Sequence, residues 1–561
     1  KYLLVLVGLC CVLSYALAER PDYPELKKSD ANIIGHVLDK KTKEHLPYIT
    51  IALKGTTIGT VTDATGHYFL KNLPEGNFIL EVSSVGYKTV TRNVTLKKGK
   101  TLEEDFEIEE DAIALDGVVV SANRSETTRR MAPTLVNVVD LKLFETTNSS
   151  TLSQGLNFQP GVRVETNCQN CGFQQVRING LDGPYTQILI DSRPVFSALS
   201  GVYGLEQIPA SMIERVEVMR GGGSALFGSS AIAGTINIIT KEPLRNSGQL
   251  SHTITSLGGS SSFDNNTSLN ASLVTDDHRA GLYIFGQNRY RSGYDYDGDG
   301  FTELPKLKNQ TVGFRSYLKT STYSKLTFEY HHMQEFRRGG DMLNRPPHEA
   351  HIAEQLQHSI DGGSLKFDYF SPDEKNRLSV FASAANTDRD SYYGPGNDPL
   401  KAYGKTTDLT AMGGAQYVHT FDKCFFMPSD LTAGLEYNRD RLKDNMWGYN
   451  RHTDQTVNIY SAFLQNEWKN DRWGILIGGR LDKHNMVDNV IFSPRANLRF
   501  NPTQNINLRL SYSSGFRAPQ AFDEDMHIEN VGGTVAMIER AKNLKEEKSQ
   551  SFSVSADMYH R

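Results

Sequence analysis

Residues 208–221 read IPASMIERVEVMRG, and residues 225–240 read ALFGSSAIAGTINIIT. Both stretches gather β-branched and aliphatic residues into runs of strand length that end at charged residues, and residues 210–213 favour a short helix before the first run. The glycines between the runs allow tight backbone turns. The run at 221–223 lacks the Gly-Lys-Ser/Thr ending of a phosphate-binding loop, so we discount nucleotide binding.

Two further motifs lie upstream, VRINGLDG at residues 176–183 and YTQILIDSRP at residues 185–194. The order of all these motifs resembles the plug domain of TonB-dependent outer-membrane receptors. The resemblance implies an α/β plug over residues 128–243, seated inside a membrane-spanning β-barrel.

In that family, charged plug residues tie the plug to the barrel wall, and plug loops contact the substrate. Charges held in a barrel away from bulk water must be paired, which agrees with the first role, although surface positions are the alternative. The matching charges are Arg177, Glu214, Glu217 and Arg220. The candidate substrate contacts, within residues 168–173 and 196–203, are Phe173, Phe196 and Tyr203.

Residues 30–110 alternate apolar and polar residues in short runs separated by Gly, Pro and Asp, which predicts a small antiparallel β-sandwich. The strings TDATGHYF at 62–69 and VGY at 85–87 resemble the carboxypeptidase-regulatory-like domain, an immunoglobulin-type sandwich. Despite its name, that domain is not an enzyme. It commonly precedes outer-membrane importers of the Bacteroidetes, so the resemblance points to a receptor of that type.

A short β-branched segment follows the sandwich within residues 113–124 and reads LDGVVVSA at 115–122. Taken alone it predicts an edge strand. It also resembles the TonB box, which pairs its backbone with the sheet edge of the partner protein TonB. The coupling residues that this resemblance implies are Leu115, Asp116, Gly117, Val118, Val119 and Val120.

Residues 247–561 contain recurring segments of alternating polarity with aromatic ends and polar loops between them. This pattern suits a transmembrane β-barrel, because one face of each strand meets lipid and the other meets the lumen. About fourteen strands can be placed, whereas the family's barrel has about twenty-two. The chain stops at MYHR and not at a strand with a terminal aromatic, so we expect a C-terminally truncated 22-stranded antiparallel barrel.

Composition excludes other classes. The 561-residue chain has a mean hydropathy of −0.44, and no internal run reaches the ~20 apolar residues of a spanning helix. Its 60 Lys and Arg against 65 Asp and Glu leave no basic excess for nucleic acid. Residues 1–18 carry one cation, an apolar run and a final Ala-Leu-Ala, which predict a signal peptide, with an uncleaved anchor as the alternative.

Two cysteines are spaced as Cys168-Gln-Asn-Cys171. An exported chain meets oxidising conditions, so the spacing favours a small disulfide loop. A zinc site would need a second pair of ligands at similar spacing, which the sequence lacks.

Residues 295–303 read DYDGDGFTE. The carboxylates of Asp295, Asp297 and Asp299, followed by the Phe301 carbonyl, match the ligand order of an EF-hand-type calcium loop. Lys306 stands where that loop has its bidentate Glu, and Glu303 is the available substitute. The segment is therefore either a structural calcium site or a solvated acidic loop, and no other cofactor is expected.

Residues 346–354 read PPHEAHIAE, and His358 follows. The string departs from HExxH because Ile352 occupies the place of the second histidine. On a helix, His351, Glu354 and His358 would lie near one another and suit zinc, and a metallopeptidase is the non-transport alternative. A solvated loop also fits, which leaves the roles of these residues and of His348 open.

FRAP at residues 516–519 and NLKEE at 543–547 resemble two boxes of these receptors, although the usual Pro after Asn is absent. Haem receptors of the family carry a histidine between the boxes. His527 is therefore a further candidate substrate contact.

Together these features predict a mostly β chain with an Ig-like sandwich, a plug and a barrel. The resemblance implies an importer and not an enzyme, in the outer membrane, with the sandwich and plug entry on the periplasmic side. Its implied partners are TonB with its inner-membrane complex, outer-membrane lipid, a metal-chelate ligand and a surface lipoprotein. A ferric siderophore is the expected cargo, with cobalamin and haem as alternatives. Three Trp do not provide evident sugar platforms for SusC-type glycan import.

Overall fold

The computed structural model describes residues 28–558 except 48, 64, 85–86, 110–117, 125–126, 169–171, 195–205, 207, 276–277, 396–401, 504, 522–525, 532–533 and 542. The predicted signal peptide at 1–18 lies outside these residues. Within them, the helices are too short and too polar to qualify as membrane-crossing segments.

The N-terminal domain is a sandwich of two small sheets, as the alternation predicts, but it is not wholly antiparallel, because two of its strand pairs run parallel. One sheet has the order β4-β1-β7 with β8 also on β1, and the other has the order β3-β2-β5-β6. Inward residues such as Ile33, Ile51 and Leu80 are completely buried between them. The strands are β1 (Lys28–Asp39), β2 (Thr50–Leu53), β3 (Gly59–Val61), β4 (His67–Pro74), β5 (Gly76–Ser83), β6 (Val90–Leu96), β7 (Thr101–Glu103) and β8 (Phe106–Ile108).

The plug is built on a four-stranded sheet of order β11-β15-β16-β14, in which β14 and β16 run parallel. Short helices and one hairpin, β12–β13, flank this sheet. Its elements are β9 (Val118–Val119), β10 (Thr127–Thr128), β11 (Val136–Asp140), α2 (Leu141–Thr146), α3 (Leu152–Leu156), β12 (Val162–Cys168), β13 (Phe173–Ile178), η1 (Gly183–Tyr185), β14 (Thr186–Ile190), η2 (Ala210–Met212), β15 (Ile213–Arg220), α5 (Ser224–Phe227) and β16 (Gly234–Thr240).

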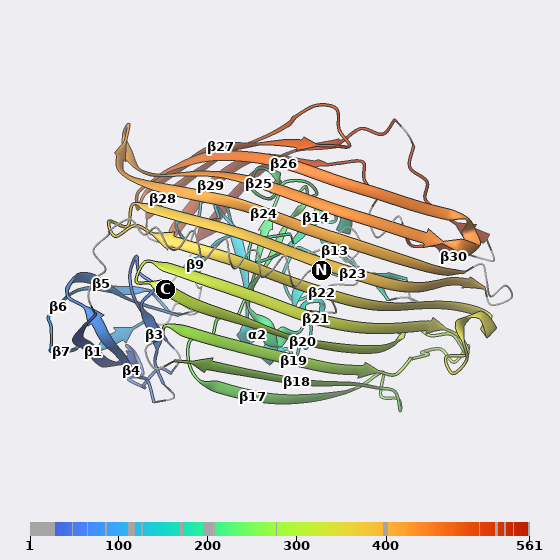
Figure 1. Ribbon diagram of the computed structural model, residues 1–561, viewed down its shortest axis with the longest axis horizontal. Coiled ribbons are helices and arrows are strands. Elements are labelled where there is room, and N and C mark those ends of the chain that lie inside the picture. The colour runs from blue at the N-terminus through green and yellow to red at the C-terminus, as the bar shows by residue number, and fades with distance from the viewer. Residues whose placement is uncertain are drawn as a thin grey trace.

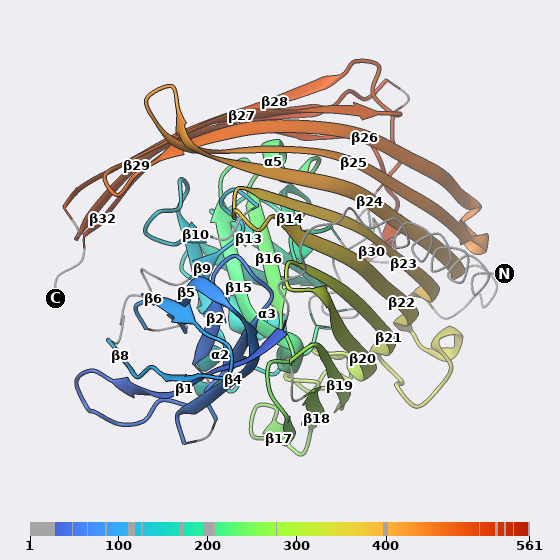
Figure 2. The same cartoon turned by 60° about the vertical axis from the view of Figure 1, so that its left-hand side comes forward.

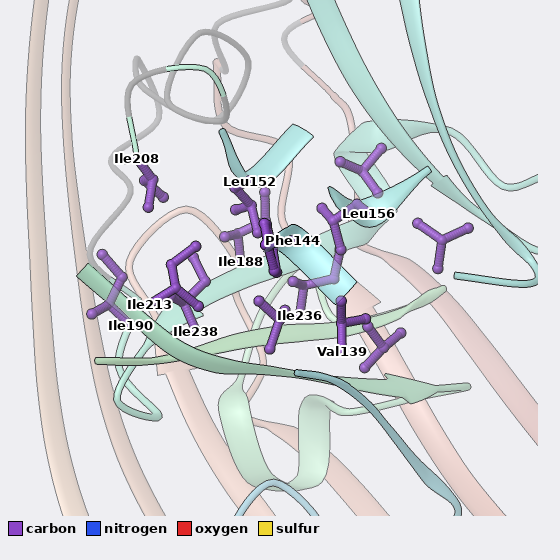
Figure 3. Close-up of a cluster of buried hydrophobic side chains, with 14 of the residues drawn as sticks. Val139, Phe144, Leu152, Leu156, Ile188, Ile190, Ile208, Ile213, Ile236 and Ile238 are labelled. Atoms are coloured by element: carbon purple, nitrogen blue, oxygen red, sulfur yellow. The ribbon is translucent and has the colours of Figure 1, made fainter. Parts of the chain in front are cut away.

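The hydrophobic core of the plug lies between this sheet and the two helices α2 and α3. Ile213, Ile236 and Ile238 project from the strands towards Phe144 and Leu156 of the helices, and all five are nearly or fully buried (Figure 3). The runs that end in charged residues are therefore the central strands of this sheet. The short helix expected at 210–213 is one turn of 3₁₀ helix, η2.

After the plug, the described residues form one large antiparallel sheet of fourteen strands, which agrees with the number of alternating segments. Sequential strands are neighbours throughout. They are β17 (Ser247–Ser256), β18 (Phe263–Val274), β19 (Ala280–Arg291), β20 (Lys306–Ser321), β21 (Ser324–Gly340), β22 (Ile352–Phe370), β23 (Asn376–Pro395), β24 (Tyr403–Cys424), β25 (Met427–Met446), β26 (Arg451–Lys469), β27 (Trp473–His484), β28 (Ile491–Thr503), β29 (Ile506–Arg517) and β32 (Glu547–Met558). The short η3 (Pro347–Glu349), η4 (Trp447–Tyr449), β30 (Glu529–Val531) and β31 (Thr534–Ala536) lie in its loops.

This sheet curves around the plug, as Figure 2 shows. Its polarity is the reverse of that of a soluble sandwich, because apolar side chains face outward and polar ones face the plug. Leu435 and Phe492 are more than half exposed on the outer face, whereas their neighbours Glu436 and Ser493 are buried. The alternation of apolar and polar residues along each strand therefore corresponds to an outer apolar surface and an inner polar wall.

The two ends of the sheet differ. At one end the turns are short, for example between Ser321 and Ser324, and at the other end long loops connect the strands. The N-terminal domain lies at the short-turn end (Figure 1). There, Thr57 donates a backbone hydrogen bond of 2.9 Å to Thr322, and the Thr60 hydroxyl lies 3.1 Å from the His278 ring.

Truncation of a plug core residue is expected to loosen the plug sheet selectively. Ile236→Ala removes a fully buried side chain and should lower the free energy of opening of β14–β16 by about 2–5 kcal/mol, because the cavity cannot collapse completely. Hydrogen–deuterium exchange of the full chain in detergent measures this change. Leu181→Ala, at a plug residue that is 45% exposed, is the control and should change exchange little. Equal exchange in the two variants would contradict this packing.

Candidate functional site: the plug and the inner wall of the sheet

The predicted coupling segment runs directly into the plug. Leu115, Asp116 and Gly117 lie outside the described residues. Val118 and Val119 form β9, which pairs with β10, and Val119 is completely buried. The described half of the segment is therefore folded against the plug and is not an exposed strand.

Glu217, on the central strand β15, holds the end of this segment. Its Oε2 accepts hydrogen bonds from the Val120 N–H at 2.9 Å, the Ser121 N–H at 2.9 Å and the Ser121 hydroxyl at 2.7 Å. Arg215 Nε donates to its other carboxylate oxygen at 3.0 Å. Since Glu217 has no exposed surface, these bonds satisfy a carboxylate that would otherwise be costly to bury.

The four charges predicted to tie the plug to the barrel wall have different partners in the described part of the chain. Arg177 pairs with Glu165 and Asp182 of the plug itself. Glu214 and Glu217 both pair with Arg215, and Arg220 donates to the Pro160 carbonyl. These pairs stabilise turns and neighbouring strands inside the plug. Glu214 also interacts electrostatically with Arg315 of β20, so the predicted tie of these charges to the wall stays a prediction.

Other residues form ion pairs with the wall. Arg124, three residues beyond Ser121, pairs with Glu436 of β25, and Arg480 of β27 pairs with the same carboxylate at 2.6 Å. Arg480 also pairs with Asp482 at 2.8 Å. The Arg124 guanidinium lies 4.9 Å from the ring centroid of Phe463 on β26. The chain thus passes from the coupling segment directly into a buried salt bridge with the wall.

A second set of contacts joins the middle of the plug to the wall. Asp191, which follows β14, pairs with Arg315 of β20 at 2.6 Å, and Arg315 also pairs with Glu329 of β21 at 2.7 Å. Glu242, which follows β16, pairs with Lys325 at 2.8 Å. Both plug strands therefore end on charges of the wall.

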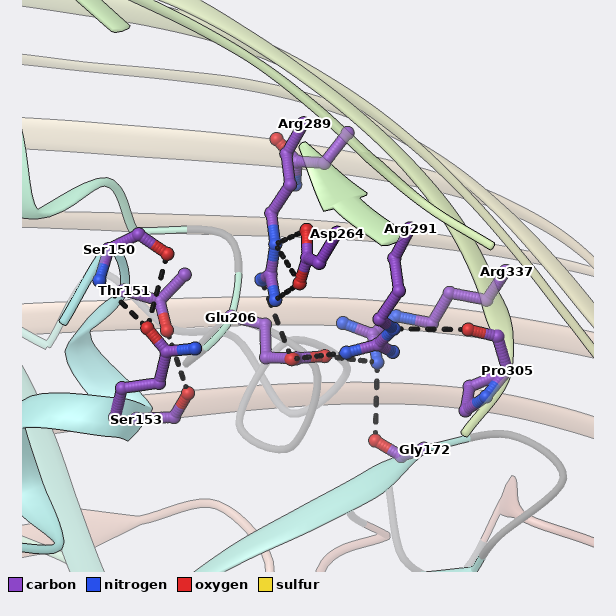
Figure 4. A network of polar contacts seen from close by, with 12 residues as sticks. Ser150, Thr151, Ser153, Gly172, Glu206, Asp264, Arg289, Arg291, Pro305 and Arg337 are labelled. Carbon is purple, nitrogen blue, oxygen red and sulfur yellow. Dashed lines mark hydrogen bonds and ion pairs between the residues drawn. The ribbon is translucent and has the colours of Figure 1, made fainter. Parts of the chain in front are cut away.

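A third network surrounds Glu206 of the plug (Figure 4). Its carboxylate lies 2.8 Å from Arg337, 3.2 Å from Arg291 and 3.5 Å from Arg289. Asp264 pairs with Arg289 at 2.6 Å. Burial alone raises the pKa of Glu206, but the arginines Arg291, Arg337 and Arg289 outweigh burial and lower this pKa from 4.5 to about 2.

A cavity of about 270 Å³ adjoins this network between the plug and strands β17–β19. Polar side chains of the plug and of the wall line it, including Ser150, Gln154, Gln174, Thr253 and Asn266. The cavity suits a polar or charged occupant better than an apolar one.

Only two of the four predicted substrate contacts, Phe173 and His527, lie among the described residues. Phe173 is the first residue of β13, at the end of the hairpin that lies towards the long loops. Phe196 and Tyr203 lie outside the described residues. His527 belongs to the long loop between β29 and β32, where its Nε2 lies 3.3 Å from Glu354 Oε2 at the start of β22.

Cys168 ends β12 and meets the same carboxylate, with its Sγ 3.1 Å from Glu354 Oε2. The predicted disulfide stays a prediction, because Cys171 lies outside the described residues. Burial lowers the pKa of His527, but hydrogen bonds to Cys168 and Glu354 outweigh burial and raise it to about 10.

The acidic loop at 295–303 brings three of its carboxylate groups close together. Oxygen atoms of Asp295, Asp297 and Glu303 all lie within 4.8 Å of one another, whereas Asp299 is not part of this group and accepts the Phe301 N–H at 2.8 Å. Asp295 also accepts the Gly298 and Gly300 N–H groups. The calcium site stays a prediction, with Glu303 as the substitute ligand.

The histidine-rich segment does not form the helix on which its zinc cluster depended. Only Pro347–Glu349 make a 3₁₀ turn, and β22 begins at Ile352. His348 bonds to Tyr403 at 2.8 Å, His351 to Asp341 at 2.6 Å, and His358 lies 3.6 Å from Glu335. His351, Glu354 and His358 are therefore not grouped as the helical alternative required, because a strand separates residues that a helix would bring together.

Sequence reasoning missed Arg124, Glu206 and the inner-wall charges that meet them. One signal was available in the strands, where charged residues two positions apart, such as Arg289 and Arg291 or Arg480 and Asp482, share the inner face. Their plug partners carry no such pattern.

Removal of the Glu206 charge is expected to weaken plug docking in a pH-dependent way. Glu206→Gln removes a carboxylate shared by three buried guanidiniums. Arg289 keeps Asp264 and Arg337 keeps Glu335, so Arg291 loses most, and the change should cost about 3–5 kcal/mol at pH 7. Because the pKa of Glu206 is depressed in the folded state, its contribution is complete above pH 4.5 and is lost as the pH falls through about 2. Hydrogen exchange of the β12–β13 hairpin at pH 7 and below pH 3 should therefore show a variant effect that shrinks on acidification.

The control is Asp182→Asn, which removes an exposed plug carboxylate and should cost less than about 1 kcal/mol at either pH. An effect of Glu206→Gln that is the same at both pH values would contradict the role of the ionised carboxylate.

Three family models match consecutive parts of the chain. They are a CarboxypepD_reg-like domain at residues 33–120, a TonB-dependent receptor plug domain at 128–235 and a TonB-dependent receptor-like β-barrel at 235–561.

Curated relatives include two vitamin B12 transporters BtuB of Vibrio vulnificus. That of strain CMCP6 is 24% identical over 425 residues, which are 73% of this chain and 64% of the relative. That of strain YJ016 is 33% identical over 174 residues, which are 30% of this chain and 28% of the relative. The chain thus spans less than two thirds of the length of these relatives.

Two solved receptors share the fold. The siderophore receptor PirA from Acinetobacter baumannii aligns with a TM-score of 0.65 and 18% identity over 77% of this chain and 69% of its own. The ferric enterobactin receptor PfeA of Pseudomonas aeruginosa aligns with a TM-score of 0.63 and 18% identity over 77% of this chain and 70% of its own. Since the barrel model alone matches more than half of the residues, the chain belongs to the TonB-dependent receptor family.

Proposed function

We propose that this protein is an active importer, and not an enzyme, that carries a metal chelate across an outer membrane. The energy would come from TonB and its inner-membrane complex. A ferric siderophore is the leading cargo, because the solved structures with the same fold include a siderophore receptor and a ferric enterobactin receptor. Haem is a further alternative, for which His527 in the long loop is the candidate contact.

The observation that carries this proposal is the connection from the coupling segment to the wall. Glu217 binds Val120 and Ser121, and Arg124 then pairs with Glu436 of β25. A pull on residues 115–120 would act first on these bonds, which join the segment to the central plug strand and to the sheet. Their rupture would loosen the plug inside the sheet and open a path for the cargo.

The difference between the two ends of the sheet supports an orientation. Short turns lie on the periplasmic side and long loops outside in barrels of this kind. The N-terminal domain at the short-turn end would thus be periplasmic, where TonB can reach the coupling segment. The outer apolar face would contact lipid, and a surface lipoprotein would have access only to the long loops.

Cobalamin is the second candidate cargo. The curated relatives include vitamin B12 transporters, and the converging carboxylates of Asp295, Asp297 and Glu303 offer a calcium site that would order a loop at the long-loop end. Glycan import finds less support in the three Trp of the chain. A metallopeptidase finds little support, since His348 and His351 are directed to different partners.

The test is uptake in cells that express the receptor with Leu115→Pro. Proline removes a backbone N–H, so pairing with a TonB strand should fail and uptake should fall to the level of cells without TonB. Labelled ferric siderophore, cobalamin and haem are assayed side by side. Leu115→Ala, which keeps the N–H, is the matched control and should retain most of the uptake.

Two outcomes separate the parts of the proposal. If a substrate enters equally well with Leu115→Pro and with the unaltered chain, the coupling assignment is wrong. If only haem or only cobalamin is imported, the coupling stands and the siderophore assignment fails.

A further inference from the structure

Three side chains with metal-binding atoms converge at the long-loop end of the lumen. They come from different parts of the fold: Cys168 from the plug hairpin, Glu354 from the wall and His527 from the loop between β29 and β32. Their ligand atoms all lie within 4.8 Å of one another. Glu354 Oε2 is the common point, 3.1 Å from Cys168 Sγ and 3.3 Å from His527 Nε2.

The surroundings of this cluster exclude most water. The side chains of His527 and Glu354 are 9% and 7% exposed, and Cys168 is partly buried. Leu356, Tyr393, Met446 and Ile528 form an almost completely buried apolar cluster against which Cys168 packs.

The apolar cluster also orients the histidine. The Tyr393 ring meets the His527 ring edge-on, with centroids 5.3 Å apart, and Tyr449 donates to the Tyr393 carbonyl. The imidazole is therefore held in place before any ligand arrives, which reduces the entropy lost on binding.

We propose that Cys168, Glu354 and His527 bind one divalent transition-metal ion, with zinc as the ion that their chemistry suits best. Thiolate, imidazole and carboxylate are the three protein ligands of zinc, and three of them in a tetrahedral site leave a fourth position for water or another ligand. Copper shares the preference for sulfur and nitrogen, whereas calcium and magnesium require oxygen ligands.

Such a site has a structural consequence. The ion would connect the tip of a plug hairpin, the inner wall and a long loop, three elements that in the described residues meet here through side chains. The inference goes beyond the proposed import function, since the ion is held by the receptor's own residues and not by a chelator.

This site and the disulfide predicted for Cys168 and Cys171 exclude each other, because a disulfide sulfur is no longer a thiolate. The variant Cys171→Ser separates the two. It removes the partner of the disulfide and leaves the three proposed ligands unchanged.

The experiment uses the full chain in detergent, reduced with a non-chelating phosphine and freed of metal. Zinc is titrated against a chromophoric competitor, and bound metal is counted by elemental analysis. We expect one zinc per chain, with affinity lowered at least about tenfold by Cys168→Ser, Glu354→Gln and His527→Gln. His348→Gln, a histidine at the same end that bonds to Tyr403, and Cys171→Ser should bind as the unaltered chain does.

Cobalt gives a second, independent readout. Cobalt bound to the unaltered chain should show sulfur-to-metal charge-transfer absorption, which Cys168→Ser should abolish. Circular dichroism of each variant establishes that the sheet is intact. Absence of stoichiometric zinc in the reduced chain, or zinc affinity in the three ligand variants as high as in the unaltered chain, would overturn the proposal. A loss of zinc affinity in Cys171→Ser as large as in the ligand variants would show that the site is not made of these three residues alone.

Discussion

The pairing of buried charges between the plug and the inner wall is the interaction on which this structure depends. A sheet with an apolar outer face must turn its polar side chains inward, and a plug then covers them from water. Unpaired charges in that position would cost several kcal/mol each. Four charged residues of the plug each form an ion pair with an opposite charge of the wall: Arg124, Asp191, Glu206 and Glu242.

The charged contacts also lie at different distances from the predicted coupling segment. Arg124 lies a few residues beyond the coupling segment, whereas Glu206 lies near the β12–β13 hairpin at the long-loop end. Force applied to the segment would thus meet the Glu217 and Arg124 contacts before it reached the other networks. Hydrogen bonds weaken steeply as their distance and angle depart from the ideal, so these contacts can break one after another without disturbing the apolar core of the plug.

Much of the fold could be predicted from the sequence because local patterns specify it. Alternation with a period of two predicted the sandwich and fourteen strands of the large sheet, and the motif order predicted the plug. The partners of the site residues were harder to predict. Arg177 and Glu214 were expected to meet the wall, yet they pair inside the plug, since nothing in a strand pattern says which neighbour will lie opposite. The side chains of the histidine segment are not grouped for a related reason, because the segment continues into a strand and not into a helix.

The sequence by itself determined the family-level architecture: a sandwich, a plug and an inward-polar sheet, each encoded in residues close together along the chain. Only the tertiary structure decided which charges are partners and which metal-binding side chains meet. Cys168, Glu354 and His527 are separated by more than 170 residues in each step. Convergence of that kind depends on how the plug sits within the curved sheet, and no local pattern records it.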